Sequence, residues 1–598
     1  MKKLFFITML LILTIWSHAT TYYIATTGNN GNSGTSTGSP WATMTYAASS
    51  SSPVAAGDTV YVKAGNYGNE NIVFQTSGTY SRPISFLGYQ TTPGDAPAIC
   101  TDKADPYATL VTTDMPTYTG SSRGSGAICM DMELVEHVFV KNFQMTAYSY
   151  GVIGGGATVK KDVHLYNICA FSIGSTTASY SGLGIRFGSM STKFANTCSF
   201  QKCLVSNACA EGFDIAGDYN YVKDCEVWCN EDASNARTDY YIIVTGSYNE
   251  INGCHIERLA GLSSTGFHGI TLKSNAEQVV DAGLPYTPIN PTHNRVINCS
   301  AVNMAESFVV RHRGVQYNHF EGCTAYGTHT GAVGSGTGEG YGIIIRDGAS
   351  YNTFTRCWIQ DCATGIKFQD TVEDGDTGGS PPGHPGHGNI VSQSVFVNCY
   401  SGIDFSNTGI SATKDCGDNL ISNNTFYRPR YFIRASKSCD SIKFEGVIVY
   451  GCASTNPNTG GVTEGFIYDN GYGSDILAAG TQSYFKDCAF YSIQTGMPAG
   501  FTAAAVGSVT VDPTFVDKDN YDFRLQASSP CIDACDHVAA ETVKTAPYCH
   551  LAHIDPLLGF LCSNKYHLRN KPHVWRDYVG TLCPVGTYAD MGAYEYKP

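Results

Sequence analysis

Three cationic residues hold matching places in short apolar segments of this chain. Lys273, Arg311 and Arg346 each end a segment in which a Gly or Ser precedes alternating apolar positions. Strand side chains alternate between two faces, so the apolar residues should point inward and the cations outward. When the segments stack in register, the three cations form one column, and Lys367 falls in the column beside it. A single outward cation is ordinarily a solvated surface residue, but three in one column favour binding of a linear polyanion.

A cation column of this kind suits the β-elimination that cleaves polymers of uronic acid. A base removes the proton at C5 of the sugar, the adjacent carboxylate must be neutralised, and an acid helps the oxygen at C4 to leave. Stabilising the enolate-like transition state is the largest requirement, and arginine meets it with a permanent, bidentate charge. Lysine acts as the base when its pKa is lowered, and Arg311 one coil on would lower that of Lys273 by like-charge repulsion.

The residues around this column resemble those of polysaccharide lyase family 6. Lys273-Ser274-Asn275 follows an apolar segment, and Arg311-His312 ends the next one. That family contains alginate lyases and chondroitinase B, which are right-handed parallel β-helices. The resemblance implies that Lys273 is the base and that Arg311 is the acid or the group that stabilises charge.

The resemblance extends over roughly residues 249–323, with departures. The family has two calcium-binding carboxylates just before the lysine, whereas this chain has Gly266 and His268 there. We expect the substrate to be bound by the polar residues around the base, which are His268, His312, Arg346 and Lys367.

An acidic group precedes Lys273 by one or two coils and consists of Glu211, Asp214 and Asp239. Calcium prefers such clusters of oxygen ligands. The segment 211–214 also resembles the acidic coil of family 9 pectate lyases, which use calcium and a lysine base. Turn-capping or solvated carboxylates are the alternative interpretation. Calcium is therefore the one cofactor that the sequence suggests, with these three residues as candidate ligands.

A second pattern predicts how the segments are stacked. An Asn is followed two residues later by an apolar residue and five residues later by a small or polar one. The copies are Asn220 to Cys225, Asn249 to Cys254, Asn294 to Cys299, Asn318 to Cys323, Asn352 to Cys357, Asn389 to Ser394 and Asn419 to Asn424. Recurring strand units at this spacing predict an all-β fold, a right-handed parallel β-helix with an N-terminal cap and irregular loop insertions. Stacked Asn side chains would then form hydrogen-bonded ladders.

The chain has 23 cysteines. Those at the fifth position of the repeat are expected to point inward as small apolar residues with free thiols. Cysteines outside the repeat are candidates for disulfides, although the sequence does not give their pairing. They are Cys531, Cys535, Cys549, Cys562 and Cys583.

The two ends differ from the repeats. A basic start, a short apolar run and a small-x-small site predict a secretory signal peptide over residues 1–19. We assign residues 20–505 to the β-helix and 506–598 to a C-terminal β segment that resembles those of secreted and surface β-helix proteins. No later run is long and apolar enough to cross a membrane. The expected location is therefore secreted, periplasmic or on the cell surface.

The net charge of −14 argues against a nucleic acid partner, so an acidic polysaccharide would have to be held by local cations. The leading hypothesis is a secreted, monomeric lyase that cleaves an alginate- or chondroitin-like polysaccharide. Three alternatives stay open: a calcium-dependent enzyme like pectate lyases, a β-helix glycoside hydrolase, and a glycan-binding surface solenoid without catalysis. A hydrolase needs two facing carboxylates, for which Asp214 and Asp239 are candidates. A binder needs exposed aromatic platforms, which the 38 tyrosines could supply.

Overall fold

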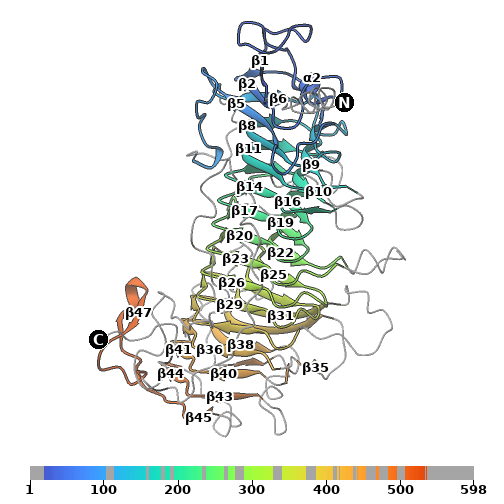
Figure 1. The fold of residues 1–598 in the computed structure, drawn as a ribbon. Coiled ribbons are helices and arrows are strands. Elements are labelled where there is room, and N and C mark those ends of the chain that lie inside the picture. Colours follow the sequence, from blue (N-terminus) through green and yellow to red (C-terminus); the bar gives the residue numbers. More distant parts are fainter. Residues whose placement is uncertain are drawn as a thin grey trace, which may run out of the picture.

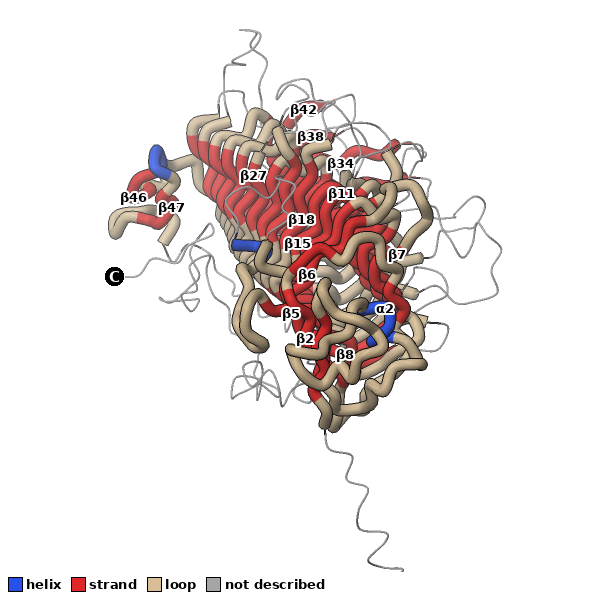
Figure 2. The backbone as a smooth tube through the Cα atoms, turned by 90° about the horizontal axis from the view of Figure 1, so that it is seen from above, coloured by secondary structure: helices blue, strands red, loops and turns tan. Residues whose placement is uncertain are grey.

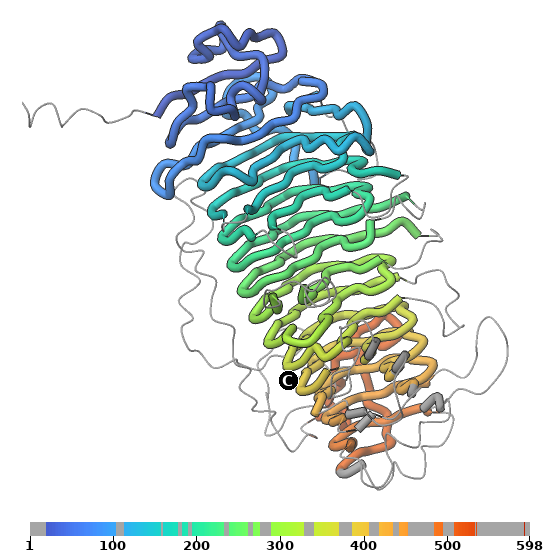
Figure 3. The backbone as a smooth tube through the Cα atoms, turned by 90° about the vertical axis from the view of Figure 1, so that its right-hand side faces the viewer, coloured from blue at the N-terminus to red at the C-terminus, as the bar shows by residue number. Residues whose placement is uncertain are grey.

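A computed structural model of the chain shows a long stack of coils. The residues that it describes are 19–102, 113–156, 160–176, 182–188, 194–231, 238–260, 267–275, 289–327, 340–371, 386–408, 414–415, 418–435, 439–440, 442–452, 467–469, 483–493, 505–532, 534 and 591. Strands of successive coils pair in parallel along the stack (Figure 1, Figure 3). The parallel β-helix predicted from the repeat is thereby confirmed. Within the described residues, no helix is long and apolar enough to cross a membrane.

One flank of the described coils is a parallel sheet of 13 strands, called the site sheet below. Its strands, in stacking order, are β4 (Ile72–Val73), β7 (Ile128–Asp131), β9 (Tyr150–Gly154), β12 (Leu183–Phe187), β16 (Glu211–Ala216), β19 (Tyr240–Thr245), β22 (His268–Lys273), β25 (Glu306–Arg311), β28 (Tyr341–Arg346), β31 (Thr364–Thr371), β34 (Ser401–Thr408), β38 (Tyr431–Ala435) and β42 (Ile467–Asp469). Equivalent residues of adjacent coils therefore lie about 4.8 Å apart.

The other flanks belong to a second parallel sheet, which has 28 described strands in two arms. The first arm consists of β1 (Thr21–Ile24), β2 (Thr59–Lys63), β5 (Ile84–Tyr89), β14 (Ser199–Gln201), β17 (Tyr221–Lys223), β20 (Glu250–Asn252), β23 (Arg295–Ile297), β26 (His319–Glu321), β29 (Thr353–Thr355), β32 (Ile390–Ser392), β36 (Leu420–Ser422), β40 (Lys443–Glu445), β43 (Tyr484–Lys486) and β45 (Ala505–Val506). The second arm consists of β3 (Gly65–Asn66), β6 (Pro116–Thr119), β15 (Leu204–Ala208), β18 (Glu226–Cys229), β21 (His255–Arg258), β24 (Ser300–Val302), β27 (Thr324–Tyr326), β30 (Trp358–Gln360), β33 (Val395–Val397), β37 (Thr425–Tyr427), β41 (Ile448–Tyr450) and β44 (Ala489–Tyr491). The long strands β8 (Val138–Thr146) and β11 (Val163–Ile173) pair with both arms and join them.

The two ends of the stack are covered differently. At the N-terminal end, the short helix α2 (Met44–Ala48) buries one face in the core. Near the C-terminal end, β46 (Phe515–Asp517) and β47 (Asp522–Leu525) form an antiparallel pair that packs Phe523 against Trp358 of the second arm. Figure 2 shows this pair beside the stack rather than within it.

Some predictions about the ends fall on residues outside the described part of the chain. These are residues 1–18 of the signal peptide and Cys535, Cys549, Cys562 and Cys583. The last described strand of the first arm, β45, falls at the predicted end of the β-helix, and the boundary itself stays a prediction. A disulfide that the sequence did not predict joins Cys100 and Cys169, whose Cα atoms are 6.1 Å apart.

The stacked Asn residues form the expected hydrogen-bonded ladder. At each step the backbone N–H of one Asn donates to the side-chain oxygen of the Asn one coil further on, at 2.8–3.1 Å. The side-chain amide donates back to a carbonyl of the preceding coil, as Asn249 Nδ2 does to Gly217 O at 3.0 Å. The ladder runs from Asn220 to Asn419 through buried positions. It satisfies polar groups inside the core and sets the register of each coil.

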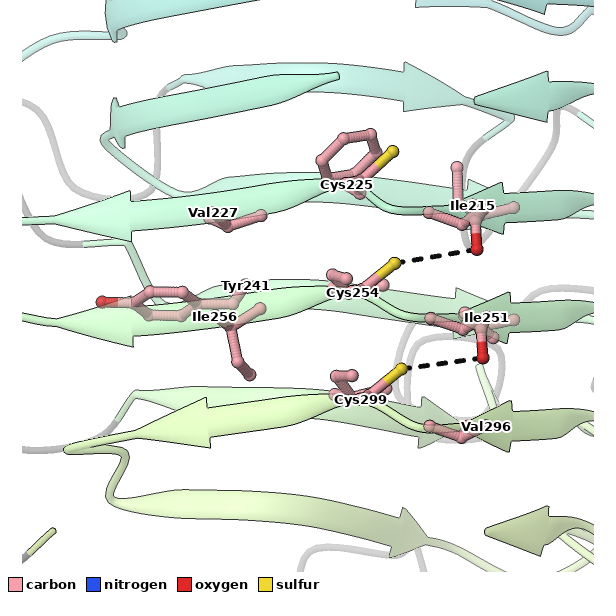
Figure 4. Packing of buried hydrophobic residues seen from close by; sticks show 14 of the residues in the cluster. Ile215, Cys225, Val227, Tyr241, Ile251, Cys254, Ile256, Val296 and Cys299 are labelled. Atoms are coloured by element: carbon pink, nitrogen blue, oxygen red, sulfur yellow. Dashed lines mark hydrogen bonds between the residues drawn. The ribbon is translucent and has the colours of Figure 1, made fainter. Parts of the chain in front are cut away.

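The repeat cysteines point into the core with free thiols, as predicted. Cys254 Sγ donates to the carbonyl oxygen of Val222 at 3.6 Å, and Cys299 Sγ donates to that of Ile251 at 3.7 Å (Figure 4). Burial raises the pKa of both thiols well above its usual value. These thiols are therefore packing groups rather than nucleophiles.

The glycine of the apolar pattern is required by core packing. A Cβ on Gly269 of β22 would lie 2.8 Å from Ile256 Cδ1, and one on Gly342 of β28 would lie 2.3 Å from Ile359 Cγ2. In β22, Gly269 and Ile270 both face the core, and His268, which precedes Gly269, lies on the opposite face. His268 is therefore outward-facing, like Lys273 at the other end of the same strand.

Candidate active site

The two outward columns of the site sheet have the predicted register. Lys273 pairs with Arg311, and Arg311 pairs with Arg346, across adjacent strands. The second column consists of Thr271, Val309, Ile344 and Lys367. Between the columns, residues such as Leu272 belong to the core. The three cations therefore stand on one outward face, one coil apart.

These cations do not form a solvated outer surface. Lys273 is 6% exposed, Arg311 is 5% exposed and Arg346 is 6% exposed. Withdrawing a charge from water is costly unless polar partners compensate. The partners of each cation therefore determine what this face can do chemically.

Lys273 contacts Tyr240, which begins β19 one coil earlier. Lys273 Nζ donates to Tyr240 Oη at 3.3 Å and lies 5.4 Å from the centre of the ring. The ring stacks on that of His268, with centroids 4.4 Å apart and planes inclined by 13°. Burial raises the pKa of Tyr240 above its usual value. Lys273 thus stands beside a phenol that is fixed in position and retains its proton.

Arg311 and Arg346 share one buried carboxylate, Asp347. The Nε atoms of Arg311 and Arg346 donate to Asp347 Oδ2 at 3.2 Å and 2.9 Å. Arg346 Nη1 also donates to Glu306 Oε1 at 3.2 Å. Burial alone would raise the pKa of Glu306, but His268 and Arg346 outweigh it and hold that pKa below its usual value. The two guanidinium groups are thus oriented by the carboxylates of Asp347 and Glu306.

His268 lies between two carboxylates from neighbouring coils. Its Nδ1 is 3.7 Å from Asp239 Oδ1, and its Nε2 is 3.4 Å from Glu306 Oε2. With Tyr240 stacked on the ring, the imidazole is restrained on three sides. His268 therefore links the environment of Lys273 to the arginine network.

His312 is fully buried directly after Arg311. Its Nδ1 lies 3.0 Å from the carbonyl oxygen of Ser274. Burial, Arg311 and Lys273 lower the pKa of His312 to about 3, so the ring is neutral at physiological pH. In this structure His312 supports the turn after β25, and its predicted contact with substrate stays a prediction.

Lys367 stands further along the sheet, among different partners. Its Nζ lies 3.8 Å from the centre of the Tyr341 ring, in a cation–π contact. The next residue in its column is Asp404, which lies 3.6 Å from Arg434. Burial raises the pKa of Asp404, while Lys367 and Arg434 act in the opposite sense.

The predicted register of the cations is present in the structure. Buried carboxylates that were not predicted lie beside these cations: Glu306, Asp347 and Asp404. Local sequence contained a signal for two of them. Asp347 directly follows Arg346, and Glu306 holds the same first outward position in β25 as His268 does in β22. Tyr240 holds this position in β19 and was also missed.

Two of the three acidic residues suggested as calcium ligands, Glu211 and Asp214, lie on β16, and the third, Asp239, directly precedes β19. Glu211 and Asp214 lie close enough on β16 for each to affect the pKa of the other. Burial raises the pKa of Glu211 well above its usual value and that of Asp214 to about 6. Asp239 instead faces His268. The described residues contain no group of three or more His, Cys, Asp or Glu side chains that could hold a metal, and calcium binding by these three residues stays a prediction.

Together these side chains place a lysine, a phenol and two oriented guanidinium groups on four successive coils. Lysine can accept a proton, and a phenol can donate one. Fixed guanidinium groups stabilise negative charge that develops beside them. The arrangement suits removal of a proton next to a carboxylate.

No family model matches the sequence of this chain, and no curated protein matches it either. Among solved structures, the chain is similar to a mannuronic acid specific polysaccharide family 6 lyase from human gut microbiota, at 12% identity and a TM-score of 0.39, over 80% of this chain and 90% of that one. It is also similar to pectate lyase Pel9A, at 14% identity and a TM-score of 0.35, over 96% of each chain. A third is the GH136 lacto-N-biosidase from Eubacterium ramulus, at 12% identity and a TM-score of 0.29, over 72% of this chain and 64% of that one. Two lyases and a lacto-N-biosidase are thus among the similar structures.

Proposed function

We propose that the chain cleaves a uronate-containing polysaccharide by β-elimination. The observation that supports this most directly is the pairing of Lys273 with Arg311 on one outward face. Lys273 removes the proton at C5. Arg311 and Arg346, oriented by Asp347, neutralise the adjacent carboxylate and stabilise the charge that develops on it.

Alginate- and chondroitin-like glycans are the first substrates to test, because the Lys273 and Arg311 segments resemble those of polysaccharide lyase family 6. The proposal includes secretion through residues 1–19 and action as a monomer outside the cytoplasm, on an acidic polysaccharide held by His268, Arg346 and Lys367.

A glycoside hydrolase is less well supported. Its two carboxyl groups must stand about 5–9 Å apart, so that the sugar fits between them. Of the two candidates, Asp214 interacts with Glu211 and Arg186, and Asp239 faces His268.

A non-catalytic glycan binder is also less well supported. Aromatic residues do occur on successive coils, each one position before an Asn of the ladder. They are Tyr219, Tyr248, His293, Tyr317 and Tyr351. These rings stack on one another with centroids 5.0–5.5 Å apart. Each inner ring has both faces covered by its neighbours, so that its edges rather than its faces reach solvent. A sugar that stacks on aromatic platforms needs the faces.

The proposal is tested by mixing the protein with alginate, chondroitin or dermatan sulfate, and polygalacturonate. The ultraviolet absorbance of the C4=C5 double bond reports elimination, and a parallel series with a chelator shows whether a cation takes part. We expect Lys273→Ala to lose about 100- to 10,000-fold in kcat. The matched control Lys223→Ala removes an outward lysine from β17 of the first arm and should stay active. Equal activity of the two variants would contradict the proposal.

A further inference from the structure

The leaving oxygen at C4 needs a proton donor, and Arg311 is poorly suited to that role. A guanidinium group does not lose its proton at ordinary pH. Arg311 Nε also donates to Asp347 Oδ2 at 3.2 Å, and Asp347 is fully buried. Deprotonating Arg311 would leave the charge of that carboxylate less well compensated. Arg311 is therefore a stabiliser of negative charge, and another group must supply the proton.

Tyr240 is placed to be that group. Its hydroxyl lies 3.3 Å from Lys273 Nζ. The ring of Tyr240 is held by stacking on His268. His268 is itself held between Asp239 and Glu306, which further restricts the Tyr240 ring. Tyr240 and Lys273 are outward-facing residues on adjacent strands of the site sheet, β19 and β22. A hydroxyl and an amine at hydrogen-bond distance can address the neighbouring C4 oxygen and C5 proton of one sugar unit from the same side.

We infer that Tyr240 is the catalytic acid of the elimination, an assignment that rests on the proposed function. Neutral Lys273 takes the proton from C5, and the electron pair of that C–H bond becomes the C4=C5 double bond. The C4–O bond breaks, and its electron pair stays on the leaving oxygen. That oxygen takes the hydroxyl proton of Tyr240, which becomes a phenolate.

The contact between the two side chains then restores the resting state. The Lys273 ammonium returns one proton to the Tyr240 phenolate across the hydrogen bond. Both residues regain their starting charge, and the products are an unsaturated uronate and a chain end with a free hydroxyl. The net reaction consumes no proton and needs no further reactant.

The test compares two leaving groups. The first substrate is the uronate polymer that the wild type cleaves. The second is a short uronide of the same sugar with fluoride at C4, which leaves without being protonated. Tyr240→Phe keeps the ring that stacks on His268, so the variant should fold, and its circular dichroism spectrum checks this. The matched control is Tyr221→Phe, which removes a hydroxyl from the first residue of β17.

We expect Tyr240→Phe to lose at least about 100-fold in kcat on the polymer but to stay within about threefold of wild type on the fluoride. Lys273→Ala should lose activity on both substrates, and Tyr221→Phe on neither. Equal losses of Tyr240→Phe on both substrates would overturn the acid role, as would full activity on the polymer. If the wild type released no unsaturated product from any uronate, the proposed function would fail, and this assignment with it.

Discussion

Outward ion pairs differ between the first arm and the site sheet of the same coils. On the first arm, Arg295 pairs with Glu250 at 3.1 Å, and its side chain stays 34% exposed. On the site sheet, Arg346 pairs with Asp347 at 2.9 Å and keeps 7% of its side chain exposed. The strand alternation that places both arginines is the same. The difference therefore lies in how far the charges are withdrawn from water.

This difference matters because exposure sets the strength of an ion pair. Exposed pairs contribute between about 0 and 1 kcal/mol and are screened by salt. Buried charges are costly to hold, and losing one partner leaves the other uncompensated. A set of buried, mutually oriented charges on one flank is a typical arrangement for a functional site, whereas on the first arm Arg295 stays partly exposed although its partner Glu250 is buried.

Among differences between the two flanks, the largest expected effect comes from changing the guanidinium group of Arg311. Arg311→Lys keeps the charge but loses the planar fork that meets a carboxylate with two donors. We expect kcat/KM to fall by about 100-fold or more, whereas Arg295→Lys on the first arm should leave it unchanged. Uronate elimination by the two variants, compared with wild type, measures this. Similar losses in both would remove the distinction between the two flanks.

A smaller effect concerns stability and pH. Burial raises the pKa of Asp214 to about 6 in the folded protein, above the value of about 3.9 in an unfolded chain. The folded state binds this proton more tightly, so stability falls as the pH rises through that window. Between about pH 4 and about pH 7, the free energy of unfolding should fall for the wild type. The fall should be roughly 1–3 kcal/mol smaller for Asp214→Asn.

Urea unfolding midpoints at the two pH values measure this difference. The control is Asp224→Asn, because Asp224 lies at the surface, 3.8 Å from Lys202. It should follow the wild-type pH dependence. If Asp214→Asn also follows the wild-type pH dependence, the carboxyl pair on β16 is not the source of the effect.

The smallest effect is expected inside the core. Cys299 Sγ donates to the carbonyl oxygen of Ile297, two residues earlier, at 3.4 Å. At the same ladder position, Ser394 Oγ donates to Ser392 O at 2.9 Å. Cys299→Ser can therefore use the equivalent bond and should cost less than about 1.5 kcal/mol, with no change in elimination rate. A larger loss in the urea midpoint would mean that the thiol has a role beyond packing.

The fold could be predicted because its determinants are local and repeated. The Asn–Cys spacing predicted the stacking and the inward thiols, and the alternation in the apolar segments predicted the register of Lys273 with Arg311. The disulfide between Cys100 and Cys169 could not be predicted, because the two residues are 69 positions apart and outside the repeat.

The candidate site was only partly predictable. Periodicity places a side chain on the outward face, but it does not show whether water reaches that face, so the burial of Arg311 was missed. It also does not show which outward residues of different coils meet. Tyr240 and Glu306 contribute through contacts with neighbouring coils, and no spacing within a single strand reveals them.

The Asn ladder also bears on how such a protein can evolve. Successive Asn residues are between 24 and 45 positions apart in the chain, yet each makes the same bond to its neighbour. The Asn–Asn hydrogen bond thus aligns each coil with the preceding one, whatever the length of the loop between them. An insertion or deletion in one loop leaves the alignment of all later strands unchanged. Loops beside the site can therefore diversify, and with them the choice of glycan, without separating Lys273 from Arg311.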